Sequence, residues 1–238
     1  MKIMISPSLA CCDWMQIGKE ICILKDAGAD TIHIDIQDLS FTSETMFPIS
    51  VLPRLNEYAG IPLDIHMMTR DIDKYMEGLL SQGRGNYITL HQESTQNIFS
   101  YLTDLKRAGA HVGLALNIGT PLVCLEDYIP MLDLVLLING VGGVRMNNKI
   151  NEVMERRISN TRKMLDEAGK ENVWVSVDGH ISIDNALRAR NAGANMYVLG
   201  TSSIYGQSCS VEDSMRHFRM EIESKDELYK KSIMRGEI

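Results

Sequence analysis

The sequence has no excess of basic residues and no long apolar run. Its 31 acidic residues outnumber 24 Lys and Arg, and the formal net charge is −7. Because nucleic-acid binding requires a basic surface, this balance argues against a nucleic-acid partner, and an anionic substrate would have to be held by local groups. No apolar run approaches the roughly 20 residues that cross a bilayer, and the segment MKIMISPSLA has no long apolar stretch ahead of a cleavage site. We therefore expect a cytoplasmic protein without a membrane partner.

Cysteine pairs with metal or redox spacing are also missing. The five cysteines are odd in number and no two have C-x-x-C spacing. They are Cys11, Cys12, Cys22, Cys124 and Cys209. This pattern favours free thiols in a reducing cytoplasm. The remaining composition, 45% apolar and 23% charged over 238 residues, is that of a globular protein with a substantial core.

Short β-branched runs alternate with amphipathic segments along the whole chain. The runs predict strands at Ile3–Leu9, Thr31–Ile36, Pro62–Met67, Tyr87–His91, Val112–Leu116, Leu134–Ile138, Val173–Val177 and Met196–Leu199. The segments between them predict helices, among them Trp14–Ala27, Ile72–Ser81, Ile98–Ala108, Asn151–Ala168 and Ile183–Ala192. Several of these helices end at a glycine, such as Gly28, Gly109 or Gly193, which takes the left-handed conformation easily and stops a helix.

Eight strands separated by helices require parallel pairing through crossover connections. A closed barrel and an open doubly wound sheet both satisfy this pattern, and eight units in 238 residues favour the barrel. The predicted fold class is therefore α/β, with a single (β/α)8 barrel. No linker divides the chain, so residues 1–238 form one predicted domain in which 219–238 are a charged C-terminal extension. Its tail, Ser224–Ile238, is expected to fray or to pack as a short extra helix.

Acidic and imidazole side chains stand at the ends of several predicted strands, where the active sites of β/α barrels lie. Residues i and i+2 of a strand share a face, so His33 and Asp35 point the same way, as do Asp64 and His66. Polar groups that point into an apolar interior need partners, and we interpret them as converging on a ligand. Two imidazoles and two carboxylates, from His33, Asp35, His66 and Asp178, suit zinc, manganese, iron or cobalt better than calcium or magnesium.

Each of these residues has another explanation when it is taken singly. A histidine is more often a hydrogen-bonded structural residue than a metal ligand, and Asp178 could simply cap the next helix. The same holds for His91 and Glu93, for which a structural hydrogen bond is favoured over a place next to the metal ligands. The methionines beside His66 are expected to pack in the core. Four acidic or imidazole side chains at three strand ends of one barrel, taken together, favour a site for one divalent metal.

Glycine and hydroxyl residues follow the last three predicted strands. They form the stretches Gly140–Gly143, Asp178–Ser182 and Gly200–Ser203. In barrels, phosphate commonly sits at the loops after the last two strands, where backbone N–H groups at a helix N-terminus bind it. Any one of these loops could be an ordinary turn before a helix, because such turns contain the same residue types. Three neighbouring loops of this type favour a phosphate site.

The chain resembles the ribulose-phosphate 3-epimerase family, including its allulose-6-phosphate branch. The matching stretches keep their order from about residue 3 to about residue 218. They are ISPSL at Ile5–Leu9, HIDIQD at His33–Asp38, PLDIHMM at Pro62–Met68, TLH at Thr89–His91, GLALNIGTP at Gly113–Pro121, DLVL at Asp133–Leu136, VDG at Val177–Gly179 and GTSSIYG at Gly200–Gly206. The last of these stretches looks more like the allulose-6-phosphate branch.

The resemblance implies a TIM barrel of the ribulose-phosphate-binding type and a role for each matching residue. It makes His33, Asp35, His66 and Asp178 the ligands of one divalent transition metal (Zn, Mn, Fe or Co), and Asp35 and Asp178 the two acid/base carboxylates. Ser8 and His66 would contact the substrate. The loops that would bind its remainder contain Gly140, Val141, Gly142, Gly143, Gly179, His180, Gly200, Thr201 and Ser202.

Three departures from the family pattern stand out. Gln37-Asp38-Leu39 occupies the place of Met-Asp-Gly, so a glutamine replaces a methionine near the metal. The stretch between Leu136 and Gly140 is shorter than usual and lacks the Pro-Gly-Phe lead-in of the substrate-covering loop. His180 stands where the family has the second glycine of Asp-Gly-Gly.

The resemblance implies a metal-dependent 3-epimerase, an isomerase that acts on a phosphorylated ketose through an enediolate. The pair would be D-ribulose 5-phosphate and D-xylulose 5-phosphate, or D-allulose 6-phosphate and D-fructose 6-phosphate. A homo-oligomer is expected. Two alternatives stay open: a diverged paralogue that binds a sugar phosphate without catalysis, and another phosphate-binding barrel lyase. The lyase is disfavoured because no lysine lies at a predicted strand end.

Overall fold

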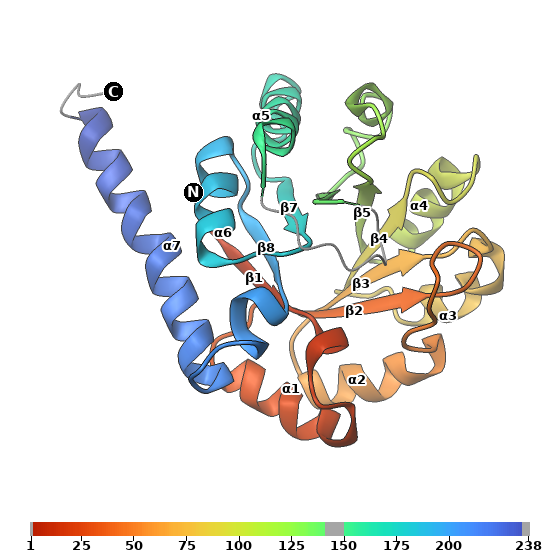
Figure 1. The fold of residues 1–238 in the computed structure, drawn as a ribbon. Coiled ribbons are helices and arrows are strands. Elements are labelled where there is room, and N and C mark those ends of the chain that lie inside the picture. The colour runs from red at the N-terminus through yellow and green to blue at the C-terminus, as the bar shows by residue number, and fades with distance from the viewer. Residues whose placement is uncertain (1, 141–149, 235–238) are drawn as a thin grey trace.

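Eight parallel strands form one sheet that curls into a nearly closed barrel in the computed structural model (Figure 1). The structure describes residues 2–140 and 150–234, with side chains as far as Ser224. The strands are β1 (Met4–Pro7), β2 (Ile32–Gln37), β3 (Leu63–Met68), β4 (Tyr87–His91), β5 (His111–Leu116), β6 (Leu134–Ile138), β7 (Trp174–Asp178) and β8 (Met196–Leu199). Their order around the sheet is β1-β8-β7-β6-β5-β4-β3-β2, and a bridge between Ser8 and His33 joins its two ends. The predicted barrel is confirmed.

Helices surround the sheet on the outside (Figure 1). They are α1 (Ile17–Asp26), α2 (Leu52–Ala59), α3 (Met76–Ser81), α4 (Ile98–Arg107), α5 (Glu152–Glu167), α6 (Ile183–Ala192) and α7 (Val211–Met234). Short turns complete them: η1 (Leu9–Cys11), η2 (Trp14–Gln16), η3 (Ile49–Val51), η4 (Ile72–Lys74), η5 (Leu122–Leu125) and the π-helical η6 (Thr201–Tyr205). None of the helices in the described part of the chain is long and apolar enough to cross a membrane.

Strand β2 shows how the sequence positions the site. All six of its residues are buried. Ile32, Ile34 and Ile36 belong to the main hydrophobic core. Because side chains alternate along a strand, His33, Asp35 and Gln37 point to the opposite face, into the barrel. An apolar outer face thus holds the strand in place while a polar inner face is presented at the barrel mouth.

Some predicted boundaries were wrong for local reasons. The first strand ends at Pro7 and not at Leu9, because Ser8 caps the turn η1 by accepting a hydrogen bond from the backbone of Ala10 at 3.2 Å. The predicted helix Trp14–Ala27 begins only at Ile17, because Asp13 caps a separate turn over residues 14–16. The predicted helix Ile72–Ser81 is likewise divided into η4 and α3.

The C-terminal helix α7 packs along the outside of the barrel beside α1 and α6. Phe218 and Ile222 of this helix are buried in the core. Arg219 of the same helix donates to the backbone carbonyl of Gly28 at 2.8 Å and to the carboxylate of Asp30 at 2.7 Å. Asp30 in turn accepts from the backbone N–H of Ile5, at the start of β1. The last helix is therefore fixed to the first strand and the turn that follows α1.

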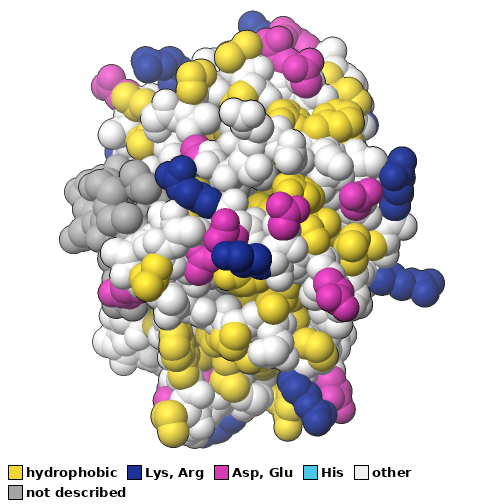
Figure 2. Space-filling view, turned by 90° about the vertical axis from the view of Figure 1, so that its right-hand side faces the viewer, with side chains coloured by type: hydrophobic (Ala, Val, Ile, Leu, Met, Phe, Trp, Pro, Cys, Tyr) yellow, Lys and Arg dark blue, Asp and Glu magenta, His cyan; other side chains and the backbone are white. Residues whose placement is uncertain are grey.

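The face of the barrel that carries α3 and α4 shows mixed surface chemistry. Acidic and basic side chains lie interspersed there with apolar ones (Figure 2). The exposed apolar residues include Leu80 of α3 and Phe99 of α4. Among the described residues, charges of both signs therefore alternate on this face.

Candidate metal centre

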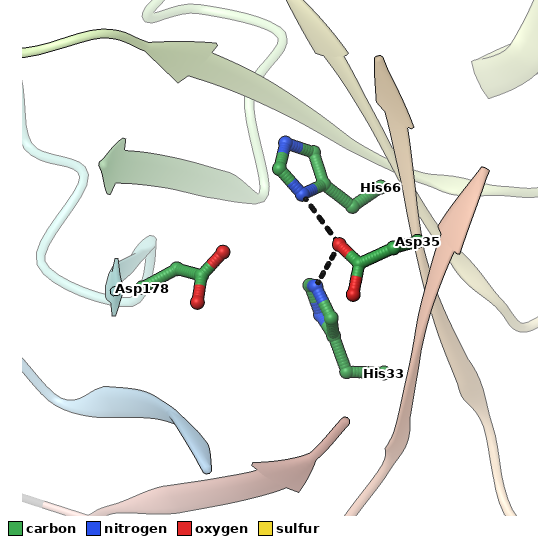
Figure 3. Close-up of side chains that lie close together, drawn as sticks. All are labelled: His33, Asp35, His66 and Asp178. Atoms are coloured by element: carbon green, nitrogen blue, oxygen red, sulfur yellow. Dashed lines mark hydrogen bonds and ion pairs between the residues drawn. The ribbon is translucent and has the colours of Figure 1, made fainter. Parts of the chain in front are cut away.

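Four side chains from three strands meet inside the mouth of the barrel (Figure 3). They are His33 and Asp35 of β2, His66 of β3 and Asp178 at the end of β7. One possible ligand atom from each lies within 4.8 Å of the corresponding atoms of the other three. The structure therefore brings together the four residues predicted as ligands.

Asp35 lies at the centre of this group. Its Oδ1 is 3.2 Å from Nε2 of His33 and 3.2 Å from Nδ1 of His66. Its Oδ2 accepts a hydrogen bond from the Ser8 hydroxyl at 3.0 Å. Asp178 approaches from the other side of the group, across from Asp35 (Figure 3). Ser8, predicted to contact the substrate, is thus in direct contact with one of the two predicted acid/base groups.

The second nitrogen of His33 has a partner that sequence reasoning left out of the site. Nδ1 of His33 lies 2.7 Å from Oδ2 of Asp64, which also accepts from the Ser6 hydroxyl at 2.9 Å. Ser6 accepts from Thr31 in turn. A carboxylate behind a metal-binding histidine fixes the ring and its tautomer. Asp64 stands two residues before His66 on the same strand face, and this spacing was the available signal.

The second nitrogen of His66 also has a partner, and here the structure differs from expectation. Nε2 of His66 lies 2.9 Å from Nε2 of His91, at the end of β4. Nδ1 of His91 lies 2.8 Å from Oε2 of Glu93. His91 and Glu93 therefore form more than the local structural pair that was favoured, because His91 contacts a predicted ligand directly. Burial holds the pKa of His91 down at about 4, so its ring is neutral at pH 7.

The buried charges push the pKa values of the group apart. Burial alone would lower the pKa of His33, but the carboxylates of Asp35 and Asp64 raise it well above 6.5. Burial alone would raise the pKa of Asp35, but His33 and His66 hold it well below its usual range. At Asp178, burial and the charge of Asp35 raise the pKa, and the histidines offset this only in part. The pKa values of the two carboxyl groups are therefore shifted in opposite directions, that of Asp35 down and that of Asp178 up.

These contacts fit a bound divalent cation. Two carboxylates and two ring nitrogens converge where His33 and His66 are fully buried, so positive charge is needed among them. The raised pKa of His33 has the same cause, because the carboxylates of Asp35 and Asp64 favour a positive charge beside them. The donors are nitrogen and carboxylate oxygen, a set that suits a transition metal. His33, Asp35, His66 and Asp178 would hold such an ion.

The predicted phosphate loops lie at the same end of the barrel. Gly179 directly follows β7 and has a φ of 99°, and His180 has a φ of 53°, in the left-handed region that favours glycine. The His180 ring contacts Ser202, whose hydroxyl lies 2.7 Å from Nδ1. Thr201 begins η6, and the N-cap residue Gly200 already donates its backbone N–H to the Ser203 hydroxyl at 3.0 Å.

Gly140 follows β6 with a φ of 148°. The other predicted residues of this loop, Val141, Gly142 and Gly143, lie outside the described residues.

The model of the ribulose-phosphate 3 epimerase family matches residues 4–205. This chain belongs to that family. Its epimerase relatives include the ribulose-phosphate 3-epimerase of Bacillus subtilis, 32% identical over 87% of this chain and 94% of the relative. The chloroplastic ribulose-5-phosphate-3-epimerase of Arabidopsis thaliana is 32% identical over 86% and 72%. A mutant tryptophan synthase alpha-subunit of Pyrococcus furiosus is similar in fold, with a TM-score of 0.65 and 11% identity over 94% of this chain and 98% of that one.

Two departures from the epimerase pattern have a visible structural setting. His180 keeps the left-handed backbone that explains a glycine in the family, and its side chain is held by Ser202. Gln37 is buried on the face of β2 that carries His33 and Asp35, and its amide donates to the backbone carbonyl of Glu44 at 3.2 Å. The glutamine therefore ties the segment after β2 to the edge of the metal centre.

Proposed function

We propose that this protein interconverts ribulose 5-phosphate and xylulose 5-phosphate by inverting C3. The observation that supports this most is the position of Asp35 and Asp178, which face each other from β2 and β7 within one cluster of possible metal ligands. Membership of the epimerase family and the names of its relatives agree with it.

The reaction requires a proton to leave C3 on one face and another to arrive on the opposite face. Asp35, with its lowered pKa, is the ionised group that accepts the first proton, and Asp178, with its raised pKa, is the group that donates the second. In the reverse direction the two exchange roles. Because each carboxylate serves one face, the substrate does not need to turn over between the steps.

Loss of the C3 proton next to the C2 carbonyl leaves an enediolate, whose negative charge needs stabilisation. A divalent metal, when bound, supplies it as a Lewis acid. The residues that would hold this ion are His33, Asp35, His66 and Asp178, and their nitrogen and oxygen donors favour zinc, manganese, iron or cobalt. Ser8, which donates to Asp35 at 3.0 Å, keeps this carboxylate oriented toward C3.

The phosphate of the substrate would bind at the loops after β7 and β8. Helix α6 begins at Ile183, and its N-terminal amides follow the Gly179–His180 turn. Anions are favoured at such a helix start. Ser202 adds a hydroxyl donor from the neighbouring loop, and Gly200 and Thr201 lie beside it. Binding energy from this distant group positions C3 between the two carboxylates.

The experiment that tests the proposal uses two substrates. Purified protein is incubated with ribulose 5-phosphate or with allulose 6-phosphate, each with added Zn²⁺, Mn²⁺, Fe²⁺ or Co²⁺, and epimer formation is followed. Turnover of the pentulose, lost in Asp35→Asn, is the expected result. Turnover of the hexulose alone would move the protein to the other substrate class. Binding of both sugars without turnover would support a non-catalytic paralogue, and carbon–carbon cleavage a lyase.

We also propose a reducing compartment such as the cytoplasm and an assembly of several copies. All five cysteines are free thiols, which supports the first part. The thiol of Cys12 is unreactive at neutral pH because burial raises its pKa to about 12. The homo-oligomer stays a prediction, and sedimentation of the purified protein tests it.

A further inference from the structure

One layer of residues inside the barrel is small and polar, where barrels of this type usually carry bulky branched side chains. The residues of such a layer come from alternate strands. Here they are Ser6 of β1, Asp64 of β3, Gly113 of β5 and Ser176 of β7. We call these four residues the polar layer. It contains no leucine, isoleucine or valine to fill the centre of the barrel.

The strand register places these four residues at one level. At constant height around a barrel of this type the chain advances by about one residue per strand. Each member should therefore lie two positions beyond the residue that the ladder reaches from the previous member. The ladder leads from Asp64 through Tyr87 to His111, from Gly113 through Leu134 to Trp174, and from Ser176 through Met196 to Met4.

The polar layer is closed at both ends. Toward the barrel mouth, Oδ2 of Asp64 lies 2.7 Å from Nδ1 of His33, so the layer lies directly beneath the metal centre. On the other side lie the side chains of a separate buried apolar cluster, Met4, Leu134 and Met196. Asp64 is 1% exposed and Ser6 and Ser176 are fully buried, so bulk solvent does not reach them.

Three oxygen atoms of this region lack a hydrogen-bond partner among the described residues. They are Oδ1 of Asp64, Oγ1 of Thr89 and Oγ of Ser176. Thr89 of β4 belongs to this region because a Cβ built on Gly113 would collide with its hydroxyl. A buried polar atom that forms no hydrogen bond destabilises the folded state. Three such atoms around a layer of small residues indicate a ligand that can hydrogen-bond to them.

We infer that ordered water binds inside the barrel at the polar layer, hydrogen-bonded to Asp64, Thr89 and Ser176. A buried water typically has about three partners. It can donate to the Asp64 carboxylate, which only accepts, and pair with both hydroxyls, which can donate or accept. Three oxygen atoms are too few for a hard cation, which takes about six or more. The inference does not depend on the proposed function, because none of these atoms belongs to the four possible metal ligands.

The water would complete the hydrogen bonding of the carboxylate that holds His33. Oδ2 of Asp64 already accepts from the Ser6 hydroxyl at 2.9 Å and faces His33 at 2.7 Å. With Oδ1 bound to water, both oxygens of this carboxylate have partners, and the group cannot rotate without breaking them. Asp64, Thr89 and Ser176 are therefore positioning residues that act beneath the metal centre.

A crystal structure of the wild-type protein tests the site directly. Ordered water should lie within about 2.5–3.2 Å of at least two of the three oxygen atoms. Density in which apolar side chains fill the layer, or in which these oxygens pair with one another, would overturn the inference. A protein that contains this water but binds no divalent metal would refute only the metal site of the proposed function.

Thermal unfolding of two variants provides an independent test. Thr89→Val and Ser176→Ala each remove one partner of the water, so each should lower the melting temperature by about 2–4 °C. If the layer were dry, each substitution would instead remove an unpaired buried hydroxyl and leave the melting temperature unchanged or higher. Because both hydroxyls share the water, the double variant should lose less than the sum of the single losses.

The matched control is Thr161→Val in helix α5. Its hydroxyl is also buried without a partner among the described residues, but it lies outside the barrel. We expect this variant to keep or exceed the wild-type melting temperature. Equal losses in Thr161→Val and Thr89→Val, or losses that simply add in the double variant, would contradict a shared water. If a barrel variant fails to fold, the wild-type crystal structure still decides.

Discussion

Replacing Asp178 by Asn should separate proton exchange from epimerisation. The amide keeps the shape of the side chain and an oxygen that can still face the cluster, but it can neither accept nor deliver the proton. Asp35 approaches from the other strand and keeps its partners Ser8, His33 and His66. It can still remove the C3 proton of one epimer and return a solvent proton to the same face.

The size of the effect follows from what is lost. A positioned acid or base contributes about 10²–10⁴-fold, so turnover should fall by at least 10²-fold, which corresponds to about 3 kcal/mol or more in the barrier. Burial raises the pKa of Asp178, and a shift in this direction suits a group that has to carry the proton it donates. Besides Asp35, which serves the other face of C3, the described part of the cluster holds no carboxylate that could replace it.

The assay is performed in heavy water with the metal-loaded protein. Ribulose 5-phosphate and xylulose 5-phosphate are supplied separately, and NMR follows deuterium at C3 and the amount of the other epimer. Deuterium should enter one epimer only, with little conversion. Metal content is measured alongside, because a weakened site would also suppress exchange, and the exposed Asp127→Asn is the control. A fully loaded Asp178→Asn protein that epimerises within about tenfold of the wild-type rate would refute the two-carboxylate mechanism.

Three further outcomes are expected. The isolated protein should carry about one equivalent of divalent transition metal, and His66→Ala should lose most of it; full occupancy by metal analysis would remove His66 from the ligands. Because the folded pKa of His33 is raised, a metal must displace its proton, so calorimetry in buffers of different ionisation enthalpy should show proton release and an affinity that weakens as pH falls. A metal affinity that does not change with pH would contradict this. His180→Gly should preserve or improve affinity for the phosphorylated substrate and should not lower the melting temperature, because His180 has a φ of 53°; a collapse of activity would show that the ring itself is needed.

The strands could be predicted because their physical signal is local. In β2 the alternation of isoleucines with His33, Asp35 and Gln37 marks both faces of the strand within six residues. Helix α2 was not among the helices named from the sequence. Its Pro53 lies in the first turn, where the missing N–H of a proline has no partner to lose.

The contacts behind the ligands could not be predicted in the same way. The pairing of His66 with His91 depends on how β3 and β4 are aligned, with His66 opposite Thr89. The anchoring of Glu93 depends on the backbone of Asn117, which arrives from the next strand along the sheet. Such contacts follow from register and closure of the barrel, and no spacing along the chain encodes them. The ligand set itself was predictable because parallel strands end at one rim.

The bond between Arg219 and Asp30 has a consequence for how the chain reaches this state. It joins residues 189 positions apart, and β1 pairs in register with β8. During synthesis β1 therefore cannot pair with β8 until residues as far as Leu199 have emerged. Contacts of such separation form late, because closing the loop between them carries a large entropic cost. A chain that ends before α7 would expose the apolar surface that Phe218 and Ile222 cover beside α1 and α6, and we expect aggregation, more than loss of catalysis, to be its first visible defect.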